Sequence, residues 1–267
     1  MLGAAFGAGN RVLIKPSDQT MLTSQAIETA IREYFDETEL AAFAGGFDLA
    51  VAFPKLPFDH LMFTGSPALA RIISAEAAQN LTPVTLELGG NAPFIVFDDA
   101  DLDLAVTGAL ASKFRNAGQT CVCANRFLVQ SGIYDEFARL LAAKVADLKM
   151  GDGLSGPTDQ GPLIDARAVA KAGRHVEDAV AGGATVLTGG VDAPVPSGGT
   201  FFAPTVLAGV RPGMALTREE TFGPVAALIR FDHESEAIAI ANDTEAGLAA
   251  YCYTRDGDRM TRMSEAL

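Results

Sequence analysis

The chain has 267 residues, 49% of them hydrophobic, and a formal net charge of −13. That apolar fraction is enough to build the core of one large domain or two ordinary ones, so a disordered chain is not expected. The acidic balance argues against nucleic acid and anionic membranes as partners, because both require a basic face. We read the acidity mainly as a source of solubility, and an anionic substrate would then need a local Arg or Lys.

Cysteine usage and the N-terminal sequence indicate a cytoplasmic protein. The three cysteines are an odd number, and two of them form the pattern Cys121-Val-Cys123, so a secreted disulfide framework is not expected. The first ten residues are apolar but lack the basic region and cleavage pattern of a signal peptide. No apolar run approaches the length of a membrane span.

The first third of the sequence predicts alternating helices and strands. We expect helices at 2–8, 17–34 and 67–80, strands at 11–15, 60–63 and 84–88, and a turn with a short helix within 41–51. Ser66 is a good N-cap and Pro67 a good first helical residue. A strand, a glycine turn at Gly65 and a helix N-terminus together form a cradle for an anion, although many strand-to-helix turns share this pattern.

The remaining sequence continues the alternation. Strands are predicted at 92–97, 127–130, 184–188, 202–207, 225–231 and 249–254, and helices at 101–116, 134–149, 166–181, 234–242 and 258–267. Such alternation is typical of an α/β protein with largely parallel strands, and we expect two sheets. The P-loop pattern and the G-x-G-x-x-G fingerprint are both absent from the sequence.

Cys121 is the main candidate for chemistry. It follows a predicted helix end and Gly118, where a side chain can be presented to a cleft. A reactive thiol needs a partly exposed place near backbone N–H groups, where its pKa is lowered. The competing interpretation is a buried small hydrophobic residue, which is the commoner fate of cysteine.

Four motifs in order resemble the NAD(P)-dependent aldehyde dehydrogenase superfamily. They are Thr64-Gly-Ser66, Leu86-Glu-Leu-Gly-Gly90, Gly118-Gln-Thr-Cys121 and Glu220-Thr-Phe-Gly-Pro224. Each motif alone is modest, but the four together are specific, and the likeness covers essentially the whole chain. The sequence from 86 to 126 resembles succinate-semialdehyde dehydrogenases. The upstream stretches 56–60 and 80–85 look more like coniferyl-aldehyde dehydrogenases.

The resemblance implies a particular domain organisation. Residues 1–88 would form part of a Rossmann-type dinucleotide-binding domain, and 89–267 an α/β catalytic domain that is truncated at its C-terminal end. Full-length members of the family carry more chain at both ends and are expected to form homo-oligomers. We therefore expect this chain by itself to be unstable or weakly active, and a non-catalytic remnant stays an alternative.

The resemblance also implies a mechanism. The Cys121 thiolate would attack an aldehyde carbon, hydride transfer to the nicotinamide would leave a thioester, and Glu87 would activate the water that hydrolyses it. A carboxylate suits general-base catalysis when its pKa is tuned toward neutrality. A thiol is both a good nucleophile and a good leaving group. The backbone N–H of Cys121 would be one oxyanion donor.

Six residues match cofactor-binding positions of the family. They are Lys15 and Asp18 at the adenosine ribose, Gly65 and Ser66 at the pyrophosphate, Glu220 at the nicotinamide ribose, and Phe222 beside the nicotinamide. A carboxylate at Asp18 accepts hydrogen bonds from ribose hydroxyls and would repel a 2′-phosphate, so NAD is favoured slightly. NADP stays open because Lys15 suits either cofactor.

Substrate and redox roles are assigned to two further residues. Arg115 matches the clamp for the distal carboxylate of the substrate in the semialdehyde enzymes, whereas its position alone indicates only a cation that complements a helix dipole. Cys123 is either a packing residue or the partner of Cys121 in a reversible, strained disulfide. Cys252 is predicted to lie in the core.

Histidine and acidic residues give no sign of a metal site. His60, His175 and His233 have no partners at ligand or triad spacing, and we treat all three as ordinary residues. The acidic run from Asp98 to Asp103 is typical of a solvated helix start rather than a calcium loop. A thiol-redox protein has little support, because C-x-C lacks the helix-start context of C-x-x-C.

Overall fold

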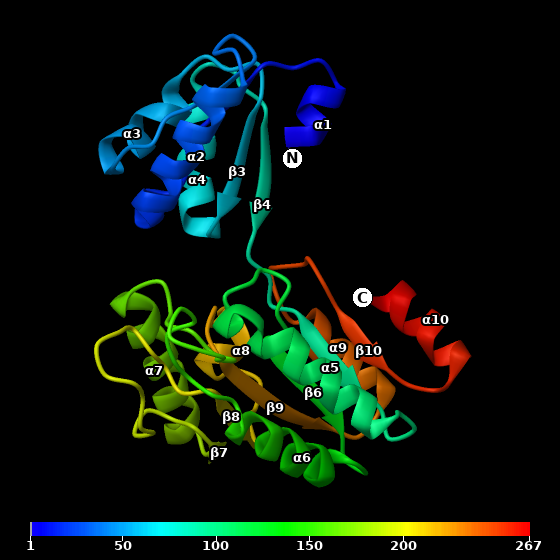
Figure 1. Cartoon of the computed structure of the whole chain (residues 1–267). Helices are drawn as coiled ribbons and strands as arrows, with labels where there is room; N and C mark the ends of the chain where they lie inside the picture. The colour runs from blue at the N-terminus through cyan, green and yellow to red at the C-terminus, as the bar shows by residue number, and fades with distance from the viewer. Residues whose placement is uncertain (1) are drawn as a thin grey trace. The chain divides into compact units, whose positions relative to one another are not determined.

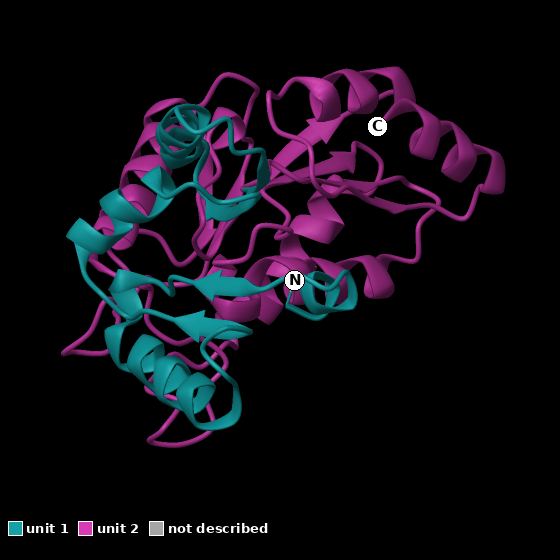
Figure 2. Ribbon diagram, turned by 90° about the horizontal axis from the view of Figure 1, so that it is seen from above, with its two compact units in different colours: residues 1–88 teal, residues 89–267 magenta. Residues whose placement is uncertain are grey.

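In the computed structural model, which describes residues 2–267, the chain divides into two compact units, residues 2–88 and 89–267 (Figures 1 and 2). Both units alternate strands with helices, as an α/β chain does. Among the described residues, no helix is long and apolar enough to cross a membrane.

The first unit contains two separate pairs of parallel strands. Its elements are α1 (Leu2–Gly7), β1 (Val12–Ile14), α2 (Met21–Tyr34), β2 (Leu40–Ala42), α3 (Phe47–Ala52), β3 (Leu61–Gly65), α4 (Pro67–Ala78) and β4 (Val84–Leu88), with 3₁₀ turns at Asp18–Thr20 and Phe53–Lys55. Strand β1 pairs with β2, and β3 pairs with β4. The strand β2 was not expected from the sequence, because three residues are too few to show a period.

The first unit buries little of its apolar surface. Its buried cluster comprises Ile31, Leu40 and Ala42, whereas Leu22 and Leu81 are 84% and 90% exposed. A sheet of two strands is marginal without further packing. The short β strands of this unit therefore depend on the helices beside them.

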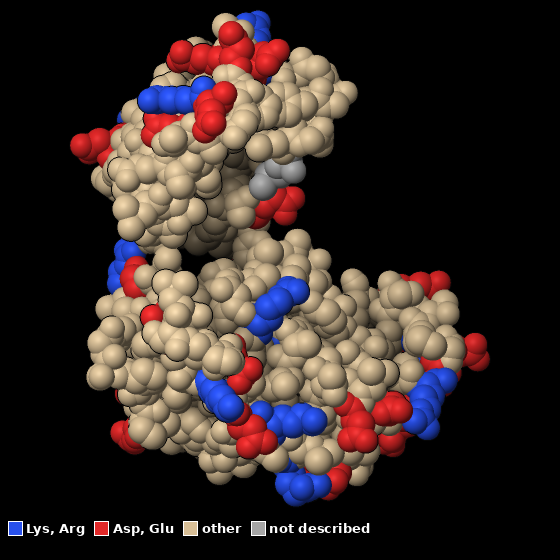
Figure 3. Space-filling model, in the orientation of Figure 1, with Lys and Arg blue, Asp and Glu red and all other residues tan. Residues whose placement is uncertain are grey.

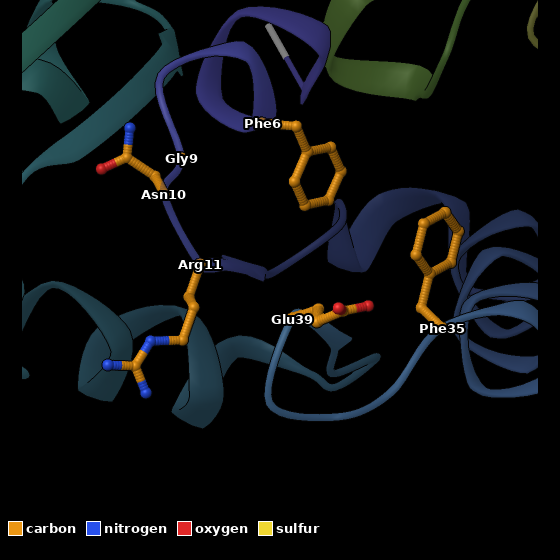
Figure 4. A pocket seen from close by; sticks show the side chains of 6 residues that line it. All are labelled: Phe6, Gly9, Asn10, Arg11, Phe35 and Glu39. Carbon is orange, nitrogen blue, oxygen red and sulfur yellow. The ribbon is translucent and has the colours of Figure 1, made fainter.

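A shallow pocket of about 330 Å³ lies in the first unit (Figure 4). The rings of Phe6 and Phe35 stack there, with centroids 6.1 Å apart, and Glu39 also lines the pocket. The side chain of Arg11 points away from the two rings in Figure 4. Two of the six residues that line the pocket are thus aromatic.

The second unit is built on one sheet of six strands. Its strands are β5 (Pro93–Val96), β6 (Arg126–Gln130), β7 (Thr185–Thr188), β8 (Thr205–Ala208), β9 (Val225–Phe231) and β10 (Tyr251–Tyr253), in the order β10-β5-β6-β9-β8-β7. Its helices are α5 (Leu102–Phe114), α6 (Tyr134–Ala146), α7 (Ala166–Ala181), α8 (Ala215–Arg218), α9 (Glu234–Asn242) and α10 (Gly257–Ala266), with a 3₁₀ turn at Arg115–Gly118. All pairs are parallel except β7 with β8.

The six-stranded sheet has a core on each face. Phe94 and Phe127 pack with residues of α5 and α6 on one face, while Ile95 and Leu128 pack with residues of α7 and α9 on the other. Because helices cover both faces, the central strands read as continuous apolar runs rather than as alternating patterns. The sheet forms the rigid base from which the loops of the candidate site extend.

Several expectations need correction. The described residues form three sheets rather than two, since the first unit splits into two pairs. Helix α5 ends at Phe114 instead of 116, because Asn116 and Ala117 take left-handed backbone angles. The last helix is Gly257–Ala266 rather than 258–267, and the Asp256 carboxylate caps it by accepting from two backbone N–H groups.

Charged side chains on the second unit are mixed in sign. On the face seen in Figure 3, Lys and Arg side chains stand beside Asp and Glu rather than in a broad basic patch. One such group ties α10 to its neighbours: Arg259 contacts Asp99 at 2.9 Å and Glu234 at 3.1 Å. An anionic ligand would therefore have to be bound by an individual cation.

Candidate functional site

Cys121 lies in a loop between α5 and β6, which we call the cysteine loop (residues 115–125). Its side chain is partly buried, whereas Cys123 is buried. The hydroxyl of Tyr251 donates to the Val122 carbonyl at 2.7 Å, and the backbone N–H of Ala124 donates to Ser112 Oγ at 3.1 Å. These bonds tie the second half of the loop to β10 of the sheet and to α5.

The cysteine loop begins with one turn of left-handed backbone. Asn116, Ala117 and Gly118 have φ angles of 52°, 54° and 75°. Left-handed geometry costs an L-residue such as Ala117 roughly 1–2 kcal/mol. The Gln119 side chain holds the turn by donating to Asn116 O and accepting from Ile164 N, and the Gln160 side chain donates to Phe114 O. Strain held by surrounding contacts is a feature of functional sites.

A second segment, residues 219–223, closes against this turn. A Cβ built on Gly118 would lie 2.2 Å from the Gly223 carbonyl oxygen, so the two backbones are in direct contact. Phe222 also has a left-handed φ of 51° and is partly exposed. Two strained loops thus meet at glycines, where no side chain separates them.

The first residues of the second unit also contact the cysteine loop and Glu220. The Gly90 N–H donates to Glu220 Oε1 at 3.3 Å. A Cβ on Gly89 would lie 2.1 Å from Glu220 Oε2, and one on Gly90 would lie 3.1 Å from the Cys121 carbonyl oxygen. Gly89-Gly90, Cys121 and Glu220 therefore come together in the second unit. Burial raises the pKa of the Glu220 carboxyl.

A buried polar network holds the three stretches in place. Asn125 Nδ2 donates to Asn91 Oδ1 at 2.7 Å, and its Oδ1 accepts from Thr221 N at 3.1 Å. Asn91 Nδ2 donates to Thr217 O at 2.8 Å. The buried guanidinium of Arg126 donates to the carbonyl oxygens of Asn91, Ile240 and Ala241. The Asn91 side chain therefore holds two of the three stretches through its amide group.

Helix α7 contacts the 219–223 segment through two basic residues. Lys171 Nζ donates to Glu220 O at 2.5 Å. His175 is buried; its Nδ1 lies 3.0 Å from Thr221 Oγ1 and its Nε2 lies 3.3 Å from Glu219 Oε2. The sequence predicts an ordinary role for His175. Its partners lie more than 40 residues away, so sequence spacing gave no signal.

Lys113 is a further buried cation that the sequence did not single out. It is 1% exposed, and burial lowers its pKa to about 8, although nearby Cys123 and Glu220 oppose the shift. A lysine in the last turn of a helix is usually a solvated partner for the dipole. Here the end of α5 is buried, and Lys113 is enclosed with it.

The residues expected at the adenosine half of a cofactor lie in the first unit. Lys15 Nζ donates to the Pro16 carbonyl at 2.8 Å, and Asp18 begins a 3₁₀ turn and is exposed. Gly65 ends β3, and Ser66 caps α4 by accepting from Leu69 N at 3.4 Å. The strand, turn and helix start expected from the sequence are all present.

A pocket of about 360 Å³ lies between α4 and β4 of the first unit. It is lined by Pro67, Ala70, Arg71, Ser74, Leu86 and Leu88. Glu87 lies on β4 between two of these residues and is exposed. The role of Glu87 as a general base, like the cofactor roles, stays a prediction.

Arg115 lies outside the helix in which it was expected. It is the C-cap of α5, with ψ of 133°, and its side chain is exposed. A cation at the C-cap still lies near the negative end of the helix dipole, so this interpretation and the role of Arg115 as a clamp both stay predictions. Cys252 lies on β10, where burial raises its pKa to about 11, as suits an unreactive thiol.

Within residues 2–267, no group of three or more His, Cys, Asp or Glu side chains could hold a metal ion.

We predict that Gly118→Ala destabilises the second unit by about 1–3 kcal/mol, because the substitution combines a left-handed φ with a clash against Gly223. Urea unfolding measures the change. Gly257→Ala is the matched control, since Gly257 has open space and no positive φ. Equal stability of the two variants would contradict the close approach.

We also predict a pH dependence from His175. Burial lowers its pKa below the ordinary 6.5; Lys171 and Arg174 lower it further and Glu219 opposes them. The unfolded chain then binds more protons than the folded one, so stability falls as the pH drops from about 7 toward the lowered value. In His175→Asn this part of the pH dependence should vanish. Urea unfolding at pH 7 and pH 5 tests this, and equal slopes for the two proteins would contradict it.

Comparison with known proteins identifies the family. The profile of the aldehyde dehydrogenase family matches residues 1–267. The chain is 50% identical over 271 residues to the NADP(+) succinate-semialdehyde dehydrogenase of Escherichia coli and 50% identical over 271 residues to a glutarate-semialdehyde dehydrogenase of Pseudomonas putida, covering 99% of this chain and 55% of each relative.

A solved structure agrees with these relatives. The crystal structure of succinate-semialdehyde dehydrogenase from Burkholderia pseudomallei matches with a TM-score of 0.94 at 48% identity, over 100% of this chain and 55% of that one. The chain spans about half the length of the curated relatives it matches. On this evidence the chain belongs to the aldehyde dehydrogenase family.

Proposed function

We propose that this chain carries the catalytic centre of an enzyme that oxidises an aldehyde with a distal carboxylate, with succinic semialdehyde giving succinate. The observation that supports it most is the convergence of the cysteine loop, Gly89-Gly90 and Glu220 in the second unit. Strained backbone at Asn116 and Ala117 places Cys121 at this convergence. Homo-oligomerisation remains an expectation for the whole enzyme.

Each proposed residue has a defined chemical task. Cys121 Sγ would attack the aldehyde carbon, and the resulting oxyanion would accept a hydrogen bond from the Cys121 N–H. Loss of hydride from that carbon leaves a thioester. Glu87 would take a proton from water as the water attacks the thioester, which releases the carboxylic acid and the thiolate.

The residues present fit a nicotinamide dinucleotide. Strand β3, Gly65 and the capped start of α4 form a strand-turn-helix unit of the kind that binds phosphate. The Glu220 carboxylate is half-buried and turned toward backbone, which suits a hydrogen bond to ribose hydroxyls. When bound, the cofactor supplies the hydride acceptor. Asp18 favours NAD, while the E. coli relative is named for NADP(+), so both cofactors belong in the assay.

Arg115 is the proposed clamp for the carboxylate of the substrate. It is an exposed cation six residues before Cys121, in a chain whose net charge of −13 repels anions. Arginine binds a carboxylate through two parallel N–H donors, and such charge-assisted bonds are strong. Both relatives are named for semialdehydes that end in a carboxylate, although the two substrates differ in length.

We predict that Cys121→Ala abolishes aldehyde-dependent NAD(P) reduction by the purified chain, because the substitution removes the proposed nucleophile. Cys252→Ala is the control, since its thiol has a raised pKa and lies on β10. Formation of NADH from succinic semialdehyde measures both. Activity retained in Cys121→Ala would contradict the assignment. A soluble wild-type chain without turnover would favour the non-catalytic alternative.

We predict that Arg115→Gln raises the KM for succinic semialdehyde by about 10–100-fold, the cost of losing one charge-assisted hydrogen-bonded pair. The KM for the neutral aldehyde butanal should change less than about twofold. Arg167→Gln, which alters an exposed arginine at the start of α7, is the matched control. An equal rise in KM for both aldehydes would contradict the clamp. A preference of the wild-type chain for coniferyl aldehyde would favour the alternative that it oxidises an aromatic aldehyde, which the stretches 56–60 and 80–85 suggest.

A further inference from the structure

We infer that His175 is a positioning residue for Glu220: it binds the residues on both sides of Glu220 and so sets where the Glu220 carboxylate lies. This inference rests on the proposed function only for its kinetic consequence. The contacts themselves are within the second unit, between α7 and the 219–223 segment.

The contacts of His175 bracket Glu220. Its Nδ1 lies 3.0 Å from Thr221 Oγ1, and its Nε2 lies 3.3 Å from Glu219 Oε2. Thr221 is 2% exposed and His175 is 4% exposed, so the first contact is shielded from water. The Glu219 side chain is 66% exposed, so the second contact is weakened by solvent. The bond to Thr221 is therefore the stronger of the two.

The chemistry of the partners determines the tautomer of the ring. An ionised carboxylate only accepts hydrogen bonds, so Nε2 must carry the proton that is donated to Glu219. In the neutral imidazole, Nδ1 is then an acceptor, and the Thr221 hydroxyl donates to it. Both ring nitrogens of His175 thereby have a hydrogen-bond partner. Protonation of Nδ1 would reverse the bond to Thr221 and remove this arrangement.

The two hydrogen bonds of His175 stabilise the 219–223 segment, whose backbone is strained. Phe222 has a left-handed φ of 51°, which is costly for a bulky residue. The Thr221 N–H is fixed by Asn125 Oδ1 at 3.1 Å, and its hydroxyl is fixed by His175. With both groups of Thr221 held, the carboxylate of Glu220 stays against Gly90 N. Loss of His175 would free one side of this segment.

Substitutions at His175 separate its two contacts. In His175→Asn the amide reaches the position of Nδ1 and keeps the bond to Thr221. In His175→Gln the amide reaches the position of Nε2 and keeps the bond to Glu219. His175→Ala loses both hydrogen bonds. We expect His175→Ala to raise the dissociation constant for NADH, measured by its fluorescence, and the KM for the cofactor about tenfold, with a smaller change in kcat. His175→Asn should restore most of the affinity and His175→Gln less.

A stability control distinguishes positioning from packing. Val176→Ala shortens the neighbouring buried side chain on α7 and leaves His175, Glu219 and Thr221 themselves unchanged. It should lower stability but leave the cofactor KM within about twofold of the wild type. If Val176→Ala raised the KM as much as His175→Ala does, the effect would be one of general stability and the inference would be wrong.

Two measurements on the chain itself do not depend on activity. Long-range ¹H–¹⁵N correlation spectra should show the proton of His175 on Nε2. The amide of Thr221 should exchange about tenfold faster in His175→Ala, while the amides of β9 keep their rates. A proton on Nδ1, or unchanged exchange at Thr221, would overturn the inference. If the wild-type chain bound no NADH, the proposed function would fail, and these two measurements would still decide whether His175 holds the segment.

Discussion

The close approach of Gly118 to Gly223 is the constraint on which the rest of the candidate site depends. Two backbone segments can touch there only because neither carries a side chain at the contact. The contact brings the cysteine loop to the 219–223 segment. Each segment contains strained, left-handed backbone, at Ala117 in the cysteine loop and at Phe222 in the 219–223 segment. The energy that offsets this strain comes from packing and hydrogen bonds elsewhere in the second unit.

Much of that compensation is a buried network of neutral and charged polar groups. Asn91, Asn125 and Arg126 use their side chains to satisfy backbone carbonyl and N–H groups that no strand or helix pairs. Such groups would be costly to bury alone. Because the network runs through Thr217 and Thr221, it joins the end of α8 to the start of β6 and keeps the loops at one edge of the sheet.

The electrostatics of the site differ from those of the whole chain. The protein is strongly acidic, yet Lys113, Lys171 and Arg126 lie around the loops of the second unit. Burial shifts the pKa of Lys113 down and that of Glu220 up, so both groups are moved toward their neutral forms. Arg115, in contrast, is exposed, so an anion can reach its guanidinium from solvent.

The regular elements were largely predictable, because their signals are local. The helix at 166–181 and the strand at 225–231 have the expected bounds, since apolar period and capping residues such as Asp165 lie within each element. The strand Leu40–Ala42 was missed because three residues show no period. The helix of Arg115 was predicted too long, because a left-handed turn at Asn116 and Ala117 has no clear signature in sequence.

The sequence by itself determined the α/β class, the order of the motifs and the likeness to the aldehyde dehydrogenase family, because these depend on local pattern and on residue identity. Only the tertiary structure decided which side chains support those motifs. His175 reaches Thr221 across 46 residues, and Asn125 reaches Asn91 and Thr221 across 34 and 96. Such partnerships are created by the packing of α7 and the loops on the sheet, and no spacing along the chain encodes them.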